Sequence, residues 1–197
     1  MQILRVGHDS LLVELDDAEQ SLALYDEARR RGVEATEIVP AARTVLFDGV
    51  GHLDALTDEI PHWSIGSGRG PGPLVEVPTV YDGEDLDAVA ELWGVSREEV
   101  VETHTATEFR VAFCGFAPGF AYCTGLPEDR AVPRLSSPRS KVPAGSVGLA
   151  GSYTGVYPSA SPGGWQLVGR TGLVLWDIHR DPPATLVPGT RVRFVAT

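Results

Sequence analysis

Hydrophobic residues in the first eighty positions follow two periods. Leu11, Val13 and Leu15 alternate with Leu12 and Glu14, which predicts a strand. Residues 18–28 carry apolar side chains at helical spacing, and Gly32 ends the pattern. Two strands, a short helix and a further strand follow at residues 33–39, 44–47, 53–60 and 74–77. The order β-α-β-β-α-β predicts a small ferredoxin-like domain over residues 1–80.

Residues 81–197 begin with helical spacing and then change period. One helix is predicted at 86–93, and the capping box of Ser96 and Glu99 predicts a second helix that runs to about His104. Short strands bounded by Gly or Pro follow at 109–113, 147–150, 166–168, 173–176 and 191–195. This pattern is typical of a closed barrel or sandwich, so the predicted fold class is α+β with domains at 1–80 and 81–197.

The stretch 108–171 combines residue types that a plain structural loop does not need. Glycine and proline fix unusual backbone angles and allow another group to approach closely. Arg139, Lys141 and Arg170 supply cationic donors for a carboxylate or a phosphate. Aromatic residues supply apolar walls, at Phe116, Phe120, Tyr157 and Trp165. The stretch therefore predicts a site for a small anionic ligand.

Each candidate residue has a structural alternative. His104 acts as an acid, a base or a donor to substrate, or else it bonds a carbonyl at the helix end. Arg139 and Lys141 lie two apart in an extended segment, which points both to one face. The chain has 27 acidic residues, so a local salt bridge is the alternative for both of them, and this alternative has more weight for Arg134 and Arg170.

Two polar residues in the stretch are interpreted as ligand-binding groups. Ser146 lacks a Gly-x-Ser-x-Gly context, so we expect a hydrogen-bond donor and not a nucleophile. Gln166 is expected to face the barrel interior and to bond an amide ligand. Tyr157 and Trp165 are ligand walls or ordinary core aromatics.

Charge narrows the class of partner. The net charge of −11 and the isoelectric point near 4.8 argue against nucleic acid and against anionic membranes. The sequence contains no apolar run long enough to span a membrane and no signal-peptide layout at Met1, so a cytoplasmic location is expected. Cys114 and Cys123 are expected to be two buried thiols with no metal site, because their spacing fits neither zinc nor redox motifs.

Several ordered motifs resemble one family. It is the carboxyltransferase C and D subdomain family, also labelled allophanate hydrolase subunit 1. Its stand-alone bacterial members are the B subunits of ATP-dependent 5-oxoprolinase, and one member inhibits a sporulation histidine kinase. The resemblance is strongest over residues 80–180. The motifs that carry it are His104-Thr105, Gly115-Phe116-Ala117-Pro118-Gly119-Phe120, Pro138-Arg139, Val142-Pro143-Ala144-Gly145-Ser146-Val147 and Ser161-Pro162-Gly163-Gly164-Trp165.

The resemblance implies a cyclophilin-like β-barrel behind the ferredoxin-like domain. It also implies two partners, a homologous C subunit and a separate A subunit, with 5-oxoproline opened to L-glutamate as ATP is hydrolysed, with or without Mg²⁺. The candidate catalytic residues are then His104, Arg139 and Lys141. The candidate ligand-binding residues are Phe116, Pro118, Gly119, Gly145, Ser146, Tyr157, Gly164, Gln166 and Arg170.

Two other functions stay open at this point. One is inhibition of a sensor histidine kinase through the barrel surface, since a fold does not fix a function. The other is biotin-dependent carboxyl transfer in urea metabolism, as the allophanate hydrolase label suggests. The biotin carrier of such systems has a lysine between methionines, and Met1 is the only methionine here. No biotin is therefore expected on this chain.

Overall fold

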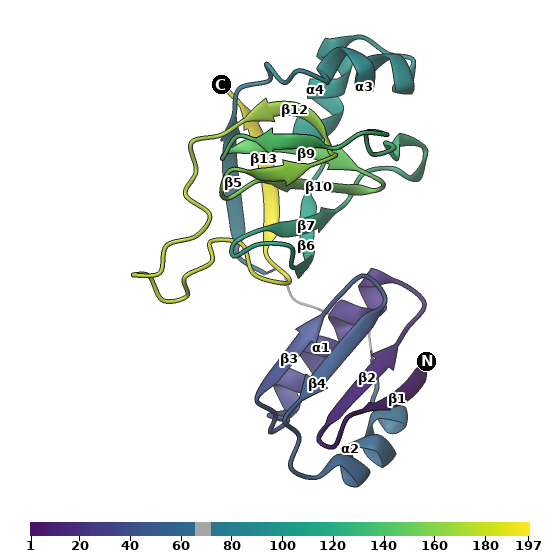
Figure 1. The fold of residues 1–197 in the computed structure, drawn as a ribbon. Coiled ribbons are helices and arrows are strands. Elements are labelled where there is room, and N and C mark those ends of the chain that lie inside the picture. The colour runs from purple at the N-terminus through teal and green to yellow at the C-terminus, as the bar shows by residue number, and fades with distance from the viewer. Residues whose placement is uncertain (66–71) are drawn as a thin grey trace. The chain divides into compact units, whose positions relative to one another are not determined.

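The computed structural model describes residues 1–65 and 72–197, and its chain divides into two compact units, Met1–Pro71 and Gly72–Thr197 (Figure 1). The glycine-rich loop expected around residues 66–73 falls mostly outside the described residues. The division comes before the strand at 74–79, which was predicted to belong to the first domain.

The first unit is a four-stranded antiparallel sheet with two helices and a short 3-10 helix. The sheet order is β1-β2-β4-β3, and α1 follows β2 as predicted. The side chain of Asp17 accepts a hydrogen bond from the Gln20 N–H at the start of α1, and Gly32 ends the helix with a φ of 67°. The elements are β1 (Gln2–Val6), β2 (Ser10–Glu14), α1 (Ala18–Arg31), β3 (Glu37–Pro40), β4 (Thr44–Asp48), α2 (Leu53–Glu59) and η1 (Ile60–His62).

The outer strand next to β2 differs from the prediction. The sequence order placed the strand at 74–77 in this sheet, but β1 pairs with β2 there, and β5 (Leu74–Thr79) belongs to the second unit. Only three residues separate β1 from β2, and Gly7 among them has a φ of 67° that suits a tight turn. A local hairpin therefore fills the position that was predicted for a distant strand.

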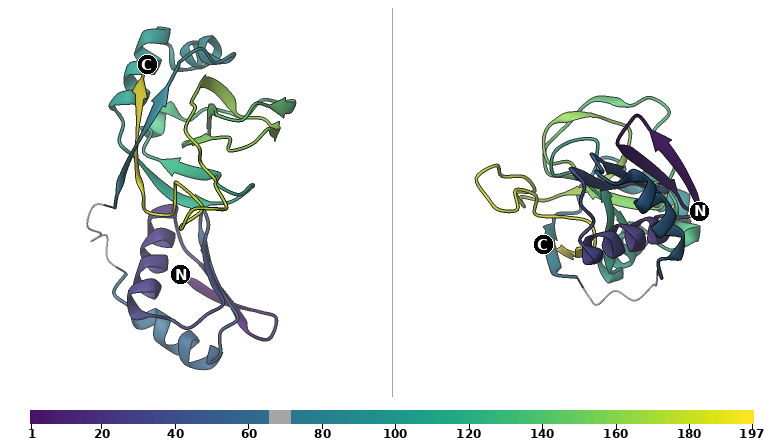
Figure 2. Two further views of the ribbon diagram at one scale, coloured as in Figure 1. Left: turned by 90° about the vertical axis from the view of Figure 1, so that its left-hand side faces the viewer. Right: turned by 90° about the horizontal axis from the view of Figure 1, so that it is seen from below.

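The second unit is built on a seven-stranded sheet that nearly closes on itself. Its order is β12-β9-β10-β7-β6-β13-β5, and β5 runs parallel to β13 (Figures 1 and 2). Val80, which directly follows β5, and Arg170, the last residue of β12, exchange two backbone hydrogen bonds of 2.9 Å. Its strands are β6 (Phe109–Cys114), β7 (Ala121–Thr124), β9 (Ser146–Ala150), β10 (Tyr153–Val156), β12 (Gln166–Arg170) and β13 (Arg191–Ala196). The predicted barrel is confirmed.

Smaller elements complete this unit. Helices α3 (Leu86–Trp93) and α4 (Arg97–Ala106) lie where they were predicted, and Ser96 and Glu99 form the expected capping box. A short 3-10 helix, η2 (Glu128–Arg130), and a two-stranded ribbon of β8 (Arg139–Val142) and β11 (Ser161–Gly163) follow. The strand predicted at 173–176 is absent from the described structure, where only Trp176 forms an isolated bridge with Ala184. In the described residues, no helix is both long and apolar enough to cross a membrane.

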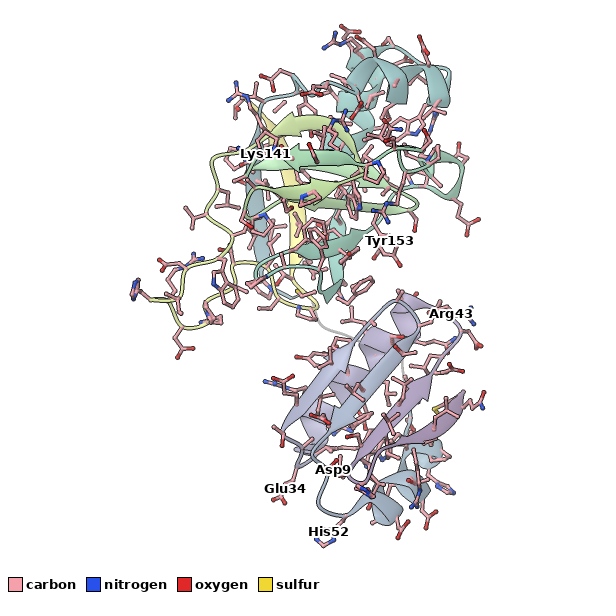
Figure 3. The ribbon with its side chains drawn as sticks, in the orientation of Figure 1. Asp9, Glu34, Arg43, His52, Lys141 and Tyr153 are labelled. Atoms are coloured by element: carbon pink, nitrogen blue, oxygen red, sulfur yellow. The ribbon has the colours of Figure 1, made fainter. Side chains whose placement is uncertain are left out.

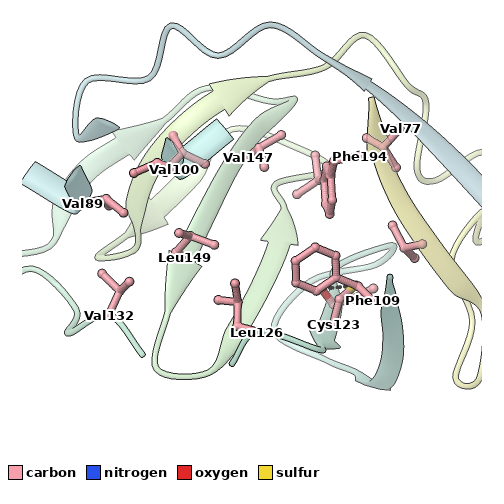
Figure 4. Packing of buried hydrophobic residues seen from close by; sticks show 14 of the residues in the cluster. Val77, Val89, Val100, Phe109, Cys123, Leu126, Val132, Val147, Leu149 and Phe194 are labelled. Carbon is pink, nitrogen blue, oxygen red and sulfur yellow. Dashed lines mark hydrogen bonds between the residues drawn. The ribbon is translucent and has the colours of Figure 1, made fainter. Parts of the chain in front are cut away.

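Two hydrophobic clusters fill the barrel unit. The larger one includes Val77, Phe109, Leu149 and Phe194, all at most 1% exposed (Figure 4). Burial of such side chains supplies most of the driving force for folding. The smaller cluster contains Phe120, Val142, Ala150, Tyr157, Trp165 and Leu167. Four aromatic and apolar members of this cluster, Phe120, Ala150, Tyr157 and Trp165, also line a pocket.

Candidate functional site

A pocket of about 350 Å³ opens beside the smaller cluster. Its walls are mainly aromatic, and Arg134 is its one charged lining residue. The aromatic lining comes from separate strands and loops of the barrel unit, at Phe116, Phe120, Tyr122, Tyr153, Tyr157 and Trp165. We call these six side chains the aromatic box. Apolar walls with a single cation suit a small ligand that has a flat body and one negative charge.

The rings of the box meet mostly edge to face. Phe120 lies 5.2 Å from Trp165 at 90° and 5.3 Å from Tyr157 at 79°, measured between ring centroids. Tyr122 lies 5.5 Å from Trp165. Edge-to-face contacts of this kind hold aromatic side chains in fixed orientations. The box is therefore a preorganised cavity, because each ring is oriented by its neighbours.

Burial affects the ionisation of the tyrosines in the box. Loss of contact with water raises the pKa of the Tyr122 and Tyr157 phenols, and the nearby Arg134 guanidinium partly offsets the rise. Both hydroxyls are consequently neutral at physiological pH. They line the pocket as potential hydrogen-bond donors and carry no charge that would repel an anion.

A tight turn forms the rim of the pocket at residues 115–120. The Ala117 N–H donates to the Gly115 carbonyl at 2.9 Å, and the Phe120 N–H donates to the Ala117 carbonyl at 2.9 Å. Phe116 has a φ of 71°, a left-handed conformation that is unfavourable for a bulky residue. Its side chain is 61% exposed and contacts Phe120 and Tyr157 edge-on. Pro118 is exposed on the same turn.

Arg134 is held at the pocket by its two neighbours in the chain. The Leu135 N–H donates to the Gly164 carbonyl at 2.8 Å, and the Gln166 side-chain amide donates to the Pro133 carbonyl at 3.2 Å. These two bonds fix the backbone on either side of Arg134. In the part of the chain that the structure describes, no carboxylate forms an ion pair with this guanidinium. Arg134 therefore offers an unpaired cation to the aromatic box.

Gln166 and Gly164 thus position Arg134. Gln166 is 6% exposed, and its side-chain oxygen is buried without a hydrogen-bond partner among the described residues. The prediction that this amide bonds a ligand stays untested, since Gln166 does not line the pocket. Gly164 is buried, and its carbonyl already accepts the bond from Leu135.

Arg139, a candidate catalytic residue, is neutralised locally. One guanidinium nitrogen donates to both carboxylate oxygens of Asp85, at 2.7 and 2.9 Å, and Glu84 lies 3.4 Å from the Nε. Asp85 also accepts the Leu167 N–H at 2.6 Å. Hydrogen bonding to Asp85 raises the pKa of Arg139 further above its usual value. Arg139 therefore forms the salt bridge that was the structural alternative to a catalytic role. The pair with Asp85 connects the segment before α3 to β8, and Asp85 connects it to β12.

His104, the second candidate catalytic residue, is fully buried on α4. Its Nε2 lies 2.9 Å from the Thr154 hydroxyl, and its Nδ1 lies 2.7 Å from the Tyr81 hydroxyl. Thr154 donates its own proton to the Gly148 carbonyl, so His104 donates from Nε2 and accepts at Nδ1. Burial lowers the pKa of His104 to about 3. The structure favours a neutral imidazole that links α4 to β10 inside the core.

The other predicted residues lie outside the aromatic box. Lys141 is exposed on β8, without an ion pair among the described residues, and Figure 3 shows it apart from Tyr153 of the box. Arg170 is paired with Asp82 at 2.9 Å on the surface. Arg139 and Lys141 therefore do not join Arg170 in one cationic cluster around the pocket.

Three small residues that were predicted to bind a ligand lie in turns or strands of the barrel. The Gly145 N–H, which was expected to meet a ligand, donates to the Tyr157 carbonyl at 2.7 Å, and Gly145 has a φ of 81°. Gly119 has a φ of 83° and packs against Leu175 and Trp176. Ser146 is 6% exposed on β9. These glycines allow turns that residues with a Cβ adopt only under strain.

Sequence reasoning found part of the aromatic box. Phe116 and Tyr157 were predicted as ligand-binding residues, and both line the pocket. The sequence did not predict Tyr122 or Tyr153 as part of the site, and it predicted no ligand contact for Arg134. One signal was present in the sequence, because Tyr122 follows Phe120 by two positions, and side chains at this spacing face the same side of an extended segment.

Comparisons with known proteins give a consistent family. A family model described as carboxyltransferase domain, subdomain C and D, matches residues 1–186. The chain is 53% identical to the 5-oxoprolinase B subunit of Escherichia coli O157:H7 over 125 residues, which cover 62% of this chain and 57% of the relative. It is 50% identical to the 5-oxoprolinase B subunit of Bacillus subtilis (strain 168) over 125 residues, which cover 62% of this chain and 52% of the relative. The chain thus spans about half the length of these curated relatives.

Similarity extends to a solved structure and to a distant relative. The crystal structure of TTHA0988 superposes with a TM-score of 0.82 at 32% identity, covering 96% of this chain and 40% of that chain. Urea amidolyase of Saccharomyces cerevisiae is 34% identical over 96 residues, which cover 47% of this chain and 5% of that protein. The fold and the family thus agree with the resemblance of the motifs.

Proposed function

This chain belongs to the family described as carboxyltransferase domain, subdomain C and D, and we propose that it acts as the B subunit of an ATP-dependent 5-oxoprolinase. The observation that carries the proposal is its 53% and 50% identity to two proteins of that name. The reaction would open 5-oxo-L-proline to L-glutamate as ATP is hydrolysed to ADP and phosphate. The urea amidolyase similarity covers a much smaller share of its relative.

The pocket chemistry is compatible with this substrate. 5-Oxoproline is a flat five-membered lactam with one carboxylate, and the pocket offers aromatic walls and one cation. The lactam is a poor electrophile, and phosphorylation of its oxygen by ATP would give an imidate phosphate that water attacks. In that reaction the chain would bind the lactam between the aromatic walls and orient it for the reaction.

ATP binding by the complex, with or without Mg²⁺, is a separate part of the proposal. Lys141 is an exposed cation without an ion pair in the described chain, so it is a candidate for contact with a phosphate. Arg170 has the same chemistry but already pairs with Asp82. Lys141→Ala should therefore raise the KM for ATP more than Arg170→Ala does.

Partner proteins complete the proposal. We infer that a homologous C subunit and a separate A subunit assemble with this chain. The segment between β12 and β13 exposes three apolar side chains, Val174, Trp176 and Ile178, which are 60%, 40% and 77% exposed. Exposed apolar residues grouped on one segment are typical of protein contacts. Ile178→Asp should weaken co-purification with the homologous C subunit without unfolding the chain.

Reconstitution tests the function directly. The chain is combined with the products of neighbouring genes that encode the C and A subunits, and glutamate release from 5-oxoproline is measured with and without ATP. We expect ATP-dependent release that stops when this chain is left out. A full set that assembles and yet releases no glutamate would contradict the proposal.

A second candidate function follows from the urea amidolyase similarity. In that case the chain would take part in biotin-dependent carboxyl transfer to urea, with the biotin on another chain. The same reconstituted set, supplied with a biotinylated carrier, a biotin carboxylase that carboxylates it from ATP and bicarbonate, and urea, would then transfer the carboxyl group from carboxybiotin to urea and consume the urea. Glutamate release without a biotin requirement favours 5-oxoprolinase.

A further inference from the structure

Most arginines of the barrel unit already have an acidic partner. The arginines that form ion pairs with carboxylates are Arg97, Arg130, Arg139, Arg170, Arg180, Arg191 and Arg193. Arg134 lines the aromatic pocket, and within residues 1–65 and 72–197 it has no such partner. Arg134 is itself exposed, so an anion from solution can reach its guanidinium and accept charge-assisted hydrogen bonds from it.

The backbone of Arg134 is anchored by its neighbours, while its guanidinium has no carboxylate partner in the described chain. Its neighbours Pro133 and Leu135 are hydrogen-bonded to Gln166 and Gly164, so its backbone is anchored on both sides. A Cβ on Gly164 would lie only 3.7 Å from the Nε of Arg134, which shows how closely the side chain runs along this glycine. The guanidinium therefore extends to the pocket from a backbone segment whose position is fixed.

We propose that Arg134 binds the carboxylate of a small planar ring held in the aromatic box, and that this recognition does not fall to Arg139 or Arg170. The identity of the ring as 5-oxoproline rests on the proposed function. A guanidinium offers two parallel N–H donors that match the two oxygens of a carboxylate. The ring would pack against the aromatic side chains, and the neutral tyrosine hydroxyls would not oppose its charge.

The conformation of Phe116 supports a ligand site at this end of the pocket. A bulky residue with a φ of 71° is held against its intrinsic preference by the turn at 115–120. Backbone strain of this kind is concentrated at binding sites, where the surrounding structure maintains it. Here the strain places the Phe116 ring at the rim, in contact with Phe120 and Tyr157. The ring would thus cover one face of the bound ligand.

The experiment compares two arginine substitutions and two kinds of ligand on the purified chain. Arg134→Gln removes the proposed contact, and Arg170→Gln removes a surface arginine that is already paired. The probes are small cyclic carboxylates (5-oxo-L-proline, L-proline and 2-furoate) and the uncharged lactam 2-pyrrolidinone. Binding is measured by calorimetry and by the fluorescence of the tryptophans, one of which lines the pocket.

The expected result is a selective loss. Arg134→Gln should weaken binding of 5-oxo-L-proline about 10- to 100-fold, as expected for hydrogen bonds to a charged group, and leave 2-pyrrolidinone unchanged. Arg134→Lys keeps the charge without the planar fork and should lie between wild type and Arg134→Gln. Arg170→Gln should bind both probes as the wild type does.

Several outcomes would overturn the assignment. It fails if Arg134→Gln, folded as judged by circular dichroism, binds 5-oxo-L-proline as tightly as the wild type. It also fails if both probes weaken equally, or if the wild-type chain binds none of the cyclic carboxylates.

Failure of the proposed function would look different. The reconstituted complex would not consume 5-oxo-L-proline, while the chain would still bind another cyclic carboxylate in a way that depends on Arg134. In that case the recognition of a ring carboxylate stands, and only the identity of the ring changes.

Discussion

Arg134 and Arg139 are five residues apart in one proline-rich stretch, and the barrel uses them differently. Arg139 donates to both oxygens of Asp85, which in turn accepts the Leu167 N–H. Arg134 lines the aromatic box and has no carboxylate partner in the described chain. The first arginine belongs to a region in which the polar groups satisfy one another. The second belongs to a region that leaves a cation and a cavity open to a ligand.

The comparison shows that residue type alone does not identify a functional group. His104 has the chemistry of a catalytic residue, but two hydroxyls satisfy it inside the core. Arg134 was a weaker candidate in the sequence, and it is the cation that lines the pocket. The polar groups of His104 and Arg139 are satisfied within the fold, whereas the guanidinium of Arg134 lines the pocket and has no carboxylate partner in the described chain.

The largest expected effect follows removal of the satisfied arginine. Arg139→Ala would leave the Asp85 carboxylate largely buried without its cation, and breaking such a pair costs about 3–5 kcal/mol. We expect the free energy of unfolding in urea to fall by that amount. Arg139→Gln with Asp85→Asn should recover part of the loss, because no unpaired charge remains. An unchanged unfolding curve together with lost turnover would restore Arg139 as a catalytic residue.

The next effect is a dependence of stability on pH that comes from His104. Its pKa is about 3 in the folded state and near 6.5 when unfolded, so the unfolded chain binds the extra proton between these values. Stability should therefore fall as the pH drops below about 6.5, by about 1.4 kcal/mol per unit. Above that pH the contribution is constant.

His104→Phe is the matched control for this pH dependence, because it fills the same space with a group that does not titrate. Carboxylates such as Glu99 and Glu108 titrate in both proteins, so the difference between the two curves isolates the histidine. Parallel curves for wild type and His104→Phe would show that His104 does not bind its proton upon unfolding as described.

Local signals in the sequence predicted the α-helices and most strands, but not β1, β7, β8, β10 or β11. The Asp17 and Gly32 caps of α1 and the capping box of α4 depend on residues at most four positions away, so the sequence alone shows them. β5 was assigned to the wrong unit because its partner, β13, lies more than a hundred residues further along the chain. Nothing in a short window distinguishes that parallel pair from a local hairpin.

The site was predicted less completely, for the same reason. The aromatic character of the stretch was visible, and it led to Phe116 and Tyr157. The pairing of Arg139 was not visible, because Asp85 precedes it by 54 positions. Which arginine is left without a carboxylate depends on the whole topology of the barrel. The motifs therefore showed which stretch of the chain forms the site. Only the fold shows that Arg139 is paired within the protein and that Arg134 lines the pocket.

A smaller effect is expected at the strained rim of the pocket. Phe116→Gly and Phe116→Ala both remove the aromatic ring, but only glycine adopts a φ of 71° without penalty. We expect the glycine variant to be about 1 kcal/mol more stable than the alanine variant, the reverse of the usual order. Both variants should weaken ligand binding equally. Greater stability of the alanine variant would show that the turn relaxes and that Phe116 is not held under strain.

The smallest effect on stability is expected at Arg134 itself. Arg134→Gln breaks no ion pair in the described structure, and the backbone bonds of Pro133 and Leu135 do not involve its side chain. The free energy of unfolding should therefore change by less than about 0.5 kcal/mol, as for most surface substitutions. Arg170→Gln should behave in the same way, because its pair with Asp82 is exposed.

Arg134→Gln and Arg170→Gln should differ in thermal stability only when a ligand is present. Saturating 5-oxo-L-proline stabilises any protein that binds it, so the wild type and Arg170→Gln should gain thermal stability while Arg134→Gln gains less. A large loss of stability in Arg134→Gln without ligand would place this arginine with Arg139, among the groups that hold the barrel together. Arg134 and Arg139 would then both stabilise the fold through partners within it, and they would differ only in how much they stabilise it.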